Sequence, residues 1–380
     1  MKTIAVVGAS LAGLTAARTL RAEGFDGRLV LIGAELHRPY DRPPLSKDFL
    51  LGKVDEAAIA LDALGDGLDI DYRLDGPATG LTGRTVHTAH GDVPADGVVL
   101  ATGATARRLP VQPDGVHVLR TLDDARALRA ALRPGAHLVI VGAGFVGAEV
   151  ASSARTLGCD VTVVEAAPIP LERAVGPEMG VALAGLLPAH GVRLLTGVGV
   201  AAVGPTHVDL ADGRHLDADA VLVGIGSAPN TGWLTGSAVA VGDGVLCDAA
   251  GATTVRGVVA AGDCAAWYDP ALRAHQRLEH WTGAGEQAVV AAATLLHARP
   301  AAPRKPAYFW SDQFGVRIQF AGHAAPGDEV TVEAGDPADG SWLSVYRRGG
   351  SVTAVLGVSQ GRLFTRRRRE ITRPALQGAS

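Results

Sequence analysis

Two glycine-rich turns of the same design, about one domain apart, constrain the fold of this chain more than any other feature. The first is GASLAG at residues 8–13 and the second is GAGFVG at residues 142–147. Each follows an apolar run typical of a buried strand and precedes an alanine-rich run typical of a helix. Glycines in such a turn let a pyrophosphate approach the backbone, and the helix N-terminus offers it free N–H groups. We therefore expect two Rossmann-like α/β units that hold two dinucleotides and pass electrons between them.

The two turns differ at the middle position of the motif. The candidate binding residues are Gly8, Ser10, Leu11, Ala12 and Gly13 in the first turn and Gly142, Gly144, Phe145, Val146 and Gly147 in the second. Ser10 stands where the pattern has a glycine, so its β-carbon crowds the expected pyrophosphate, although its hydroxyl offers a hydrogen bond. A single glycine motif indicates little, but two copies in the same strand–turn–helix context make a chance match a poor explanation.

An acidic residue after the next strand is expected to bind the ribose hydroxyls of each dinucleotide. In the second unit this residue is Glu165, at the end of the strand predicted over residues 160–165, and in the first it is Glu35, shortly after residues 28–32. The Glu165 carboxylate would repel the additional phosphate of NADPH, and no basic residue follows before Arg173. The second unit is therefore predicted to prefer NADH.

Composition excludes several classes of protein. With 380 residues, of which 47% are apolar and 19% charged, the chain is long enough for two or three folded domains. Cys159, Cys247 and Cys264 are far apart and form no CxxC pair, so we expect no metal or iron–sulfur site, no disulfide framework, and a reducing cytoplasm. Because no apolar run reaches about 18 residues and glycines interrupt the N-terminal one, we expect neither a membrane span nor a signal peptide.

Alternating strand and helix patterns predict an α/β chain with a small α+β domain at its C-terminus. The predicted limits are residues 1–109 and 230–305 for the two parts of one dinucleotide domain, 110–229 for the other, and 306–380 for the last domain. Helices are expected at residues 119–132 and 286–297, a hairpin turn around residues 211–213, and C-terminal strands at residues 316–320, 330–332, 342–346 and 352–358.

The chain resembles a known family over nearly its whole length. The segments that carry the resemblance are RPYDRPPLSK at 38–47, ATG at 101–103, GAGFVGAE at 142–149, GVVAAGD at 257–263, LEHW at 278–281 and YFWSDQ at 308–313. Their order and spacing resemble the FAD-dependent, NADH-using ferredoxin reductases, the flavoprotein components of multicomponent oxygenase systems. The resemblance implies a split FAD domain, an inserted NADH domain and a C-terminal interface domain.

The resemblance also implies roles for residues around FAD. The first glycine turn would hold the FAD pyrophosphate, Glu35 would bind its adenosine ribose, and Asp263, after Gly262, would contact its ribityl-phosphate region. The remaining cofactor-binding residues are expected to be Ala101, Thr102 and Gly103 in the ATG turn, Gly226 in a closing turn on the NADH side, Arg173, and Trp310.

Five further residues are expected to lie near the reacting rings by the same resemblance. Arg42 and Lys47 would lie beside the flavin, and Glu149 would pair with Lys47. Glu279 and Trp281 would border the flavin and the nicotinamide. Hydride would pass from NADH to FAD, and single electrons would pass to a ferredoxin that serves an oxygenase.

Each of these residues also has an ordinary structural interpretation. Lys47 could be a solvated loop lysine, and Glu149 could be a first-turn glutamate favoured by the helix dipole. The two tryptophans, Trp281 and Trp310, could be core aromatics, and the Gly262–Asp263 pair could be a common turn. The RPPLSK context favours the functional interpretation for Lys47.

The absence of cysteine at residues 43–47 separates this chain from disulfide reductases and NADH peroxidases of the same fold, because both carry cysteine there. Three alternatives stay open: an NADH oxidase, a rubredoxin reductase, and a non-enzymatic NADH-responsive protein that binds a partner or nucleic acid.

A basic tail is the last feature that bears on partners. Residues 361–380 carry six arginines and one glutamate, although the whole chain has a net charge of −4. The run Arg366, Arg367, Arg368 and Arg369 could steer an acidic ferredoxin, or it could be a solvated terminus. Nucleic acid is the weaker possibility, because the run has no wider basic surface around it.

Overall fold

The computed structural model describes residues 1–62, 67–298 and 305–371. The chain forms two compact units. The first unit comprises Met1–Asp41, Glu56–Thr105 and Ala228–Ala307, and the second comprises Arg42–Asp55, Ala106–Ser227 and Tyr308–Ser380. Two of the boundaries between the units fall within the short strands β8 (Ala104–Ala106) and β16 (Ser227–Pro229). The predicted division into three domains, one of them in two parts, stays a prediction.

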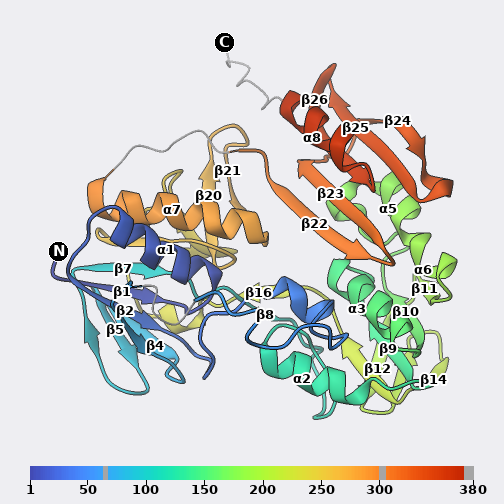
Figure 1. Ribbon diagram of the computed structural model, residues 1–380, viewed down its shortest axis with the longest axis horizontal. Coiled ribbons are helices and arrows are strands. Elements are labelled where there is room, and N and C mark those ends of the chain that lie inside the picture. The colour runs from blue at the N-terminus through green and yellow to red at the C-terminus, as the bar shows by residue number, and fades with distance from the viewer. Residues whose placement is uncertain (63–66, 299–304, 372–380) are drawn as a thin grey trace. The chain divides into compact units, whose positions relative to one another are not determined.

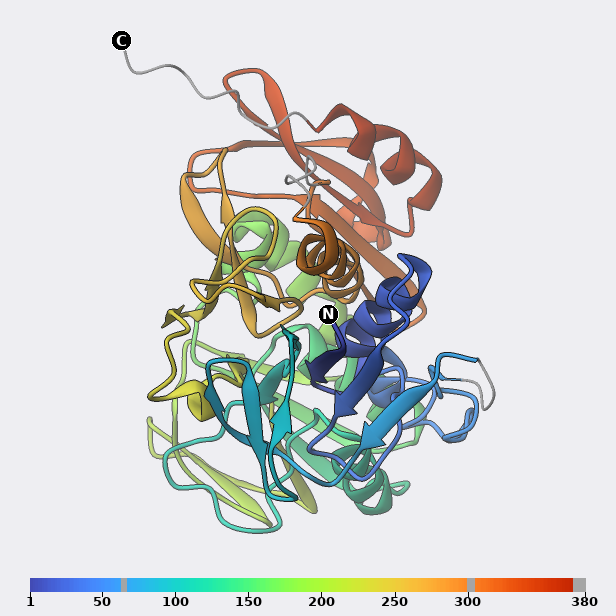
Figure 2. The same cartoon turned by 90° about the vertical axis from the view of Figure 1, so that its left-hand side faces the viewer.

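A five-stranded parallel sheet forms the centre of the first unit. Its order is β19 (Val258–Ala260), β7 (Gly97–Leu100), β1 (Thr3–Val7), β2 (Arg28–Ile32) and β3 (Ile70–Arg73). The central strands are almost wholly apolar because both faces of the sheet are covered. The helices α1 (Leu11–Ala22) and α7 (Trp281–His297) lie side by side over one face (Figures 1 and 2).

Smaller elements complete the first unit. They are an antiparallel sheet of β4 (Ala78–Thr82), β5 (Thr85–Thr88) and β6 (Val93–Pro94), a mixed sheet of β17 (Val241–Gly242), β18 (Gly244–Cys247), β20 (Ala265–Asp269) and β21 (Ala274–Arg277), and the 3₁₀ turn η2 (Gly232–Leu234).

A four-stranded parallel sheet forms the centre of the first part of the second unit. Its order is β11 (Arg193–Thr196), β10 (Asp160–Glu165), β9 (His137–Val141) and β15 (Ala220–Val223). The other elements are the antiparallel strands β12 (Val200–Gly204), β13 (His207–Leu210) and β14 (His215–Asp217), the helices α2 (Leu122–Ala131), α3 (Phe145–Thr156), α4 (Glu172–Val175), α5 (Pro177–Ala184) and α6 (Leu186–Ala189), and the 3₁₀ turn η1 (Pro43–Ser46).

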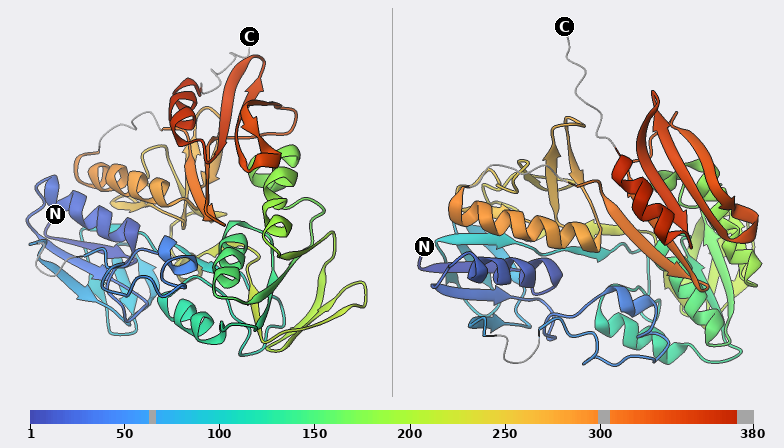
Figure 3. Two further views of the ribbon diagram at one scale, coloured as in Figure 1. Left: turned by 45° about the vertical axis from the view of Figure 1, so that its right-hand side comes forward. Right: turned by 45° about the horizontal axis from the view of Figure 1, so that its top comes forward.

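The last part of the second unit is an antiparallel sheet. Its order is β22 (Tyr308–Gln313), β23 (Val316–Gly322), β26 (Ser351–Val358), β25 (Ser341–Arg348) and β24 (Glu329–Asp336), followed by α8 (Gly361–Arg367) and by the 3₁₀ turns η3 (Pro337–Asp339) and η4 (Arg368–Glu370). One face of the sheet buries Trp342 and Tyr346 against α5, and the other buries Phe364 of α8. The ribbons of α8 and α5 lie on opposite sides of this sheet (Figure 3).

The observed elements differ from the predicted ones mainly at their ends. The helix expected at 119–132 begins at Leu122, because Thr121 and Asp124 form a capping box there. The helix expected at 286–297 begins earlier, at Trp281. The prediction placed its start too late because Gly283 and Gly285, near the helix N-terminus, weaken the helical signal in the sequence. The prediction missed β22, but the α/β class with parallel sheets and a small α+β end is confirmed.

Candidate functional site

The first glycine turn has the geometry that the sequence predicts. Gly8 has φ +123°, and a β-carbon added there would lie 1.9 Å from the carbonyl oxygen of Ala101. A β-carbon on Gly13 would lie 1.8 Å from the carbonyl oxygen of Gly8. No side chain can therefore occupy either position, and the strand, the turn and α1 pack in direct backbone contact.

Ser10 is the N-cap of α1, but its side chain does not cap the helix. The first turn of α1 carries no acidic residue. The partial positive charge at this helix end is therefore left for an anionic group such as a pyrophosphate.

A buried glutamine on α7 adjoins the Gly262–Asp263 turn. Gln287 is 4% exposed, its Oε1 accepts a hydrogen bond from the Gly262 N–H at 2.9 Å, and its Nε2 has no partner among the described residues. Buried amide donors are almost always satisfied, so this group fits a site that is completed by a bound acceptor. The sequence reasoning missed Gln287, whose only signal is one polar residue within an alanine-rich helix.

The ATG turn at residues 101–103 is held by Asn230. The Thr102 hydroxyl donates to the Asn230 carbonyl at 2.7 Å, and the Asn230 amide donates to the Thr102 carbonyl at 2.9 Å. Gly103 has φ +66°, which favours glycine. The turn lies at the carboxyl end of β7, the edge where ligands of such sheets bind.

The other predicted residues of the first unit lie in polar contacts. The Glu35 carboxylate accepts a hydrogen bond from the Tyr40 hydroxyl. The indole N–H of Trp281, whose side chain is 41% exposed, donates to Asp41 at 2.6 Å, so a plain core role is wrong for this tryptophan. Glu279 pairs with Arg277, which the sequence reasoning did not single out.

The second glycine turn repeats the first on α3. A β-carbon on Gly142, where φ is +107°, would lie 2.3 Å from the Gly224 carbonyl oxygen, and one on Gly147 would lie 2.3 Å from the Gly142 carbonyl oxygen. A β-carbon on Gly144 would meet no atom within 4 Å. The protein itself therefore requires the two outer glycines, whereas the space at Gly144 is available to a ligand.

The carboxylate of Glu165 closes the second turn from the end of β10. It accepts hydrogen bonds from the backbone N–H of Ala143 at 2.8 Å and of Ala167 at 2.9 Å. Each carboxylate oxygen has a further lone pair, so the group can still bind ribose hydroxyls. Arg173 is an exposed residue of α4.

Other predicted cofactor-binding residues lie at the surface of the second unit or in its aromatic packing. Val146 is exposed, and the Phe145 ring packs against Phe309 with centroids 4.8 Å apart. Gly226 is exposed, with φ +100°. The Trp310 ring stacks on Tyr308 at 6.1 Å.

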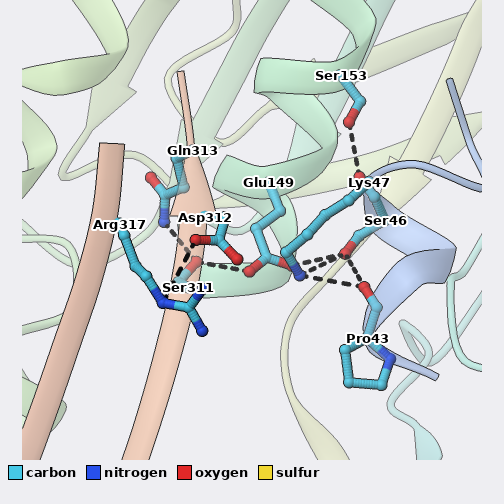
Figure 4. A network of polar contacts seen from close by, with 9 residues as sticks. All are labelled: Pro43, Ser46, Lys47, Glu149, Ser153, Ser311, Asp312, Gln313 and Arg317. Atoms are coloured by element: carbon cyan, nitrogen blue, oxygen red, sulfur yellow. Dashed lines mark hydrogen bonds and ion pairs between the residues drawn. The ribbon is translucent and has the colours of Figure 1, made fainter. Parts of the chain in front are cut away.

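Lys47 and Glu149 form the ion pair that the family resemblance implies. Their Nζ and Oε2 atoms lie 2.6 Å apart, and Glu149 is 6% exposed on the first turns of α3 (Figure 4). Lys47 follows η1, whose Pro43 and Pro44 set the start of the turn, and its Nζ also donates to the Pro43 carbonyl at 3.1 Å. Arg42 donates to the Arg120 carbonyl.

Two hydroxyl groups that the sequence reasoning missed complete this network. Ser46 and Ser311 each donate to the Glu149 carboxylate at 2.6 Å. Ser46 precedes Lys47 in the chain, and Ser311 lies on β22. A buried carboxylate is tolerated when a cation and several donors satisfy it, as here.

The cysteines take no part in these contacts. All three are buried, and burial raises the pKa of each thiol above its usual range. Because the thiolate is the reactive form, none is suited to redox chemistry. The described residues contain no group of His, Cys, Asp and Glu side chains that could hold a metal ion. None of the helices in that part of the chain has both the length and the apolar character needed to cross a membrane.

The arginine run is not a uniform charged surface. Arg367 pairs with Glu333 at 2.6 Å and with Glu370 at 2.7 Å, and the Arg368 guanidinium lies 4.8 Å from the centre of the Tyr308 ring. These two arginines therefore hold the end of α8 to the C-terminal sheet. Arg366 and Arg369 are exposed, and Arg373 of the basic tail lies outside the described residues.

Comparisons with known proteins agree with this geometry. Residues 2–288 match the family described as pyridine nucleotide-disulphide oxidoreductase, and residues 308–377 match the family described as reductase C-terminal. The chain is 39% identical to the biphenyl dioxygenase system ferredoxin–NAD(+) reductase component of Paraburkholderia xenovorans (strain LB400), over 96% of this chain and 91% of that protein. It is also 39% identical to the chlorobenzene dioxygenase ferredoxin reductase component of Cupriavidus sp. (strain PS12), over 95% and 90%.

A solved structure agrees as well. The covalent putidaredoxin reductase–putidaredoxin complex is similar to this chain with a TM-score of 0.92 and 30% identity, covering 97% of this chain and 92% of that one. The fold is thus shared along nearly the full length. This chain belongs to the pyridine nucleotide-disulphide oxidoreductase family and carries the reductase C-terminal domain.

Proposed function

We infer that this protein is an FAD-dependent oxidoreductase that takes reducing equivalents from NADH and passes single electrons to a ferredoxin that serves an oxygenase. The observation that carries this inference is the similarity to ferredoxin–NAD(+) reductase components over 96% of the chain, together with both glycine turns. When bound, FAD and NADH supply the hydride and electron-transfer chemistry. The protein supplies binding, orientation and electrostatics.

We propose that the first unit holds FAD. The first glycine turn and the uncompensated N-terminus of α1 would bind its pyrophosphate, and Glu35 would bind its adenosine ribose. The Asp263 turn and the unpartnered amide of Gln287 support a second set of polar contacts to the cofactor. Trp281 and Glu279 are proposed to border the reacting rings.

We propose that the second unit holds NADH. The space at Gly144 would take the pyrophosphate, and Glu165 would accept hydrogen bonds from the ribose hydroxyls. The carboxylate of Glu165 would repel a phosphate on the same ribose, so NADH is the preferred donor.

We propose that Lys47 and Glu149 act beside the flavin. The ammonium of Lys47 is fixed by a buried carboxylate and stays 19% exposed at its side chain, so it can stabilise negative charge that develops close to it. The pair would thus act by electrostatic stabilisation, and this proposed role requires no thiol.

We propose a ferredoxin as the electron acceptor, because the relatives that this chain resembles are named ferredoxin–NAD(+) reductase and ferredoxin reductase components. We propose that Arg366 and Arg369, the exposed members of the arginine run, steer an acidic ferredoxin. The buried, unpaired cysteines support a reducing cytoplasm as its location.

An anaerobic mixing experiment tests the proposed function. The purified protein is mixed with excess NADH and a two-iron ferredoxin, and the absorbance of flavin and ferredoxin is followed together. We expect both to bleach on a catalytic timescale. A bleached flavin with an unchanged ferredoxin would redirect the search to rubredoxin or oxygen, and slow turnover with every acceptor, together with salt-sensitive DNA binding, would favour a non-enzymatic role.

Two lysines of the same segment provide a matched comparison for the same assay. Lys47→Ala should keep the flavin bound and slow its reduction by NADH. Lys53→Ala removes an exposed lysine whose ammonium lies 3.8 Å from Asp48, and it should leave the rate unchanged. Equal rates in the two variants would return Lys47 to an ordinary structural role.

A further inference from the structure

The carboxylate of Glu149 is held from two parts of the chain that are far apart in sequence. Ser46 and Lys47 contact Oε2, and Ser311 of the C-terminal sheet contacts Oε1 (Figure 4). Ser311 is 0% exposed on β22, the first strand of the reductase C-terminal domain. Nothing in the proposed function assigns a role to this hydroxyl.

The hydrogen-bond chemistry fixes the direction of the contact. An ionised carboxylate accepts hydrogen bonds and cannot donate them, so the single proton of the Ser311 hydroxyl is directed to Glu149. The lone pairs of the same oxygen accept from the Gln313 amide, whose Nε2 lies 3.0 Å away. Gln313 is 3% exposed, so both contacts lie away from bulk solvent. A chain of donors therefore runs from Gln313 through Ser311 to Glu149.

This chain of donors matters because Glu149 in turn fixes Lys47. Removing the Ser311 hydroxyl leaves Oε1 of the buried Glu149 carboxylate without this donor. The negative charge of Glu149, next to the Lys47 ammonium, is then less neutralised. A hydrogen bond to a charged group has a large effect for a single contact. Ser311 is thus placed to control both the position of the Lys47 and Glu149 side chains and the electrostatic potential that this pair produces.

We propose that Ser311, supported by Gln313, is a positioning residue through which the C-terminal domain sets the Lys47–Glu149 pair for flavin reduction. This inference rests on the proposed function, because it needs Lys47 to act beside the flavin. It gives the C-terminal domain a part in the NADH half-reaction in addition to any contact with the electron acceptor.

Four variants separate the hydroxyl from simple packing. Ser311→Thr and Ser311→Val introduce side chains of almost equal shape, and only threonine keeps the hydroxyl. Ser311→Ala removes the hydroxyl without adding volume. Ser344→Ala is the matched control, because Ser344 is also 0% exposed in the same sheet but its hydroxyl contacts Met179 Sδ at 2.9 Å. Thermal unfolding of each variant measures the effect on folding.

The readouts are the rate of flavin reduction by NADH and the midpoint potential of the bound flavin. Ser311→Ala and Ser311→Val should slow reduction by about ten- to a hundredfold and make the potential more negative, because the negative charge of Glu149 is less compensated. Ser311→Thr and Ser344→Ala should stay close to the unmodified protein in both readouts. Gln313→Met should shift both in the same direction as Ser311→Ala, but less.

A double-mutant cycle with Glu149→Gln tests whether Ser311 acts through Glu149. If it does, adding Ser311→Ala to Glu149→Gln should change the rate and the potential little further, because the shared interaction has already been lost. Additive effects, or equal effects of Ser311→Thr and Ser311→Val, would overturn the inference. An unmodified protein that reduces no ferredoxin would instead contradict the proposed function, so the two failures are distinguishable.

Discussion

The two glycine turns of this protein share their outer positions and differ in the middle one. In both, a β-carbon on the outer glycines would lie about 2 Å from a backbone carbonyl oxygen, at Gly8 and Gly13 in the first turn and at Gly142 and Gly147 in the second. At the middle position the second turn has Gly144, with no atom within 4 Å of an added β-carbon, and the first turn has a serine.

This comparison separates what the fold requires from what the ligand requires. The outer glycines allow a strand, a turn and a helix to pack in direct backbone contact, so the protein itself fixes them. In the second turn the middle position, Gly144, faces open space, so a bound dinucleotide is what would constrain it. The first turn keeps the same close packing of its outer glycines with Ser10 in the middle, so the serine does not disturb the turn.

The largest effect is expected for an outer glycine. Gly8→Ala would place a β-carbon 1.9 Å from the Ala101 carbonyl oxygen at a positive φ, so it should destabilise the protein by at least about 3 kcal/mol and abolish FAD retention. Unfolding by denaturant and the flavin-to-protein absorbance ratio measure both. Gly285→Ala, where an added β-carbon meets nothing within 4 Å, is the control and should retain full flavin content. Normal flavin content in Gly8→Ala would break the comparison.

The middle position of the second turn should affect the ligand and spare the fold. Gly144→Ala is expected to weaken NADH binding by about tenfold, because its methyl group takes space assigned to the pyrophosphate. The unfolding midpoint should stay nearly unchanged. Ser10→Gly in the first turn should leave FAD binding equal or tighter. Titration of NADH into the flavin-loaded Gly144→Ala protein measures its NADH binding, and the flavin-to-protein absorbance ratio measures FAD retention in Ser10→Gly. A large loss of stability in Gly144→Ala would contradict the prediction.

The two acidic residues should differ in their effect on cofactor choice. Glu165→Gln is expected to raise the ratio of kcat/KM for NADPH to that for NADH by about tenfold, because the repulsive charge is removed. Glu35→Gln, in the first unit, should leave this ratio unchanged and loosen FAD only. Steady-state kinetics with both nucleotides provide the test, and equal use of NADH and NADPH by the unmodified protein would refute its premise.

The smallest expected effect is a pH dependence of stability that both units share. Burial lowers the pKa of His280 in the first unit and of His117 in the second below the ordinary value of 6.5. Between each lowered pKa and about 6.5 the unfolded chain binds more protons than the folded one, so stability is full above this range and falls as the pH drops through it. Unfolding measured from pH 7.5 to pH 5 should show this decline. His280→Asn and His117→Asn should each make the stability depend less on pH. Identical curves for the unmodified protein and both variants would show that neither histidine causes the decline.

The glycine turns and the elements next to them could be predicted from local sequence patterns. The two turns, their flanking strands and the acidic residues that follow them are contiguous in sequence, so their chemistry can be recognised without the fold. Element ends were less predictable. The capping box at Thr121 is a local signal, but α7 begins at Trp281 although Gly283 and Gly285 have low helix propensity. The helix packs against α1, and such tertiary packing supplies most of the stability of a helix in a protein.

The network around Glu149 shows where such prediction ends. The family resemblance implied the pair with Lys47, but no local pattern marks Ser46 or Ser311 as its partners, because Ser311 is 162 residues away in the chain. The arginine run is a second case, in which four adjacent residues of one type divide into two that hold α8 and two that are exposed.

The sequence by itself predicted two dinucleotide-binding units, a chemistry that uses no cysteine, and a preference of the second unit for NADH, since each prediction depends on residues close together in the chain. Only the tertiary structure decided which distant groups satisfy the buried carboxylate and which space is left for a ligand. The physical reason is that a buried charge must find donors wherever the chain folds back upon it, and sequence spacing does not record which segment supplies them.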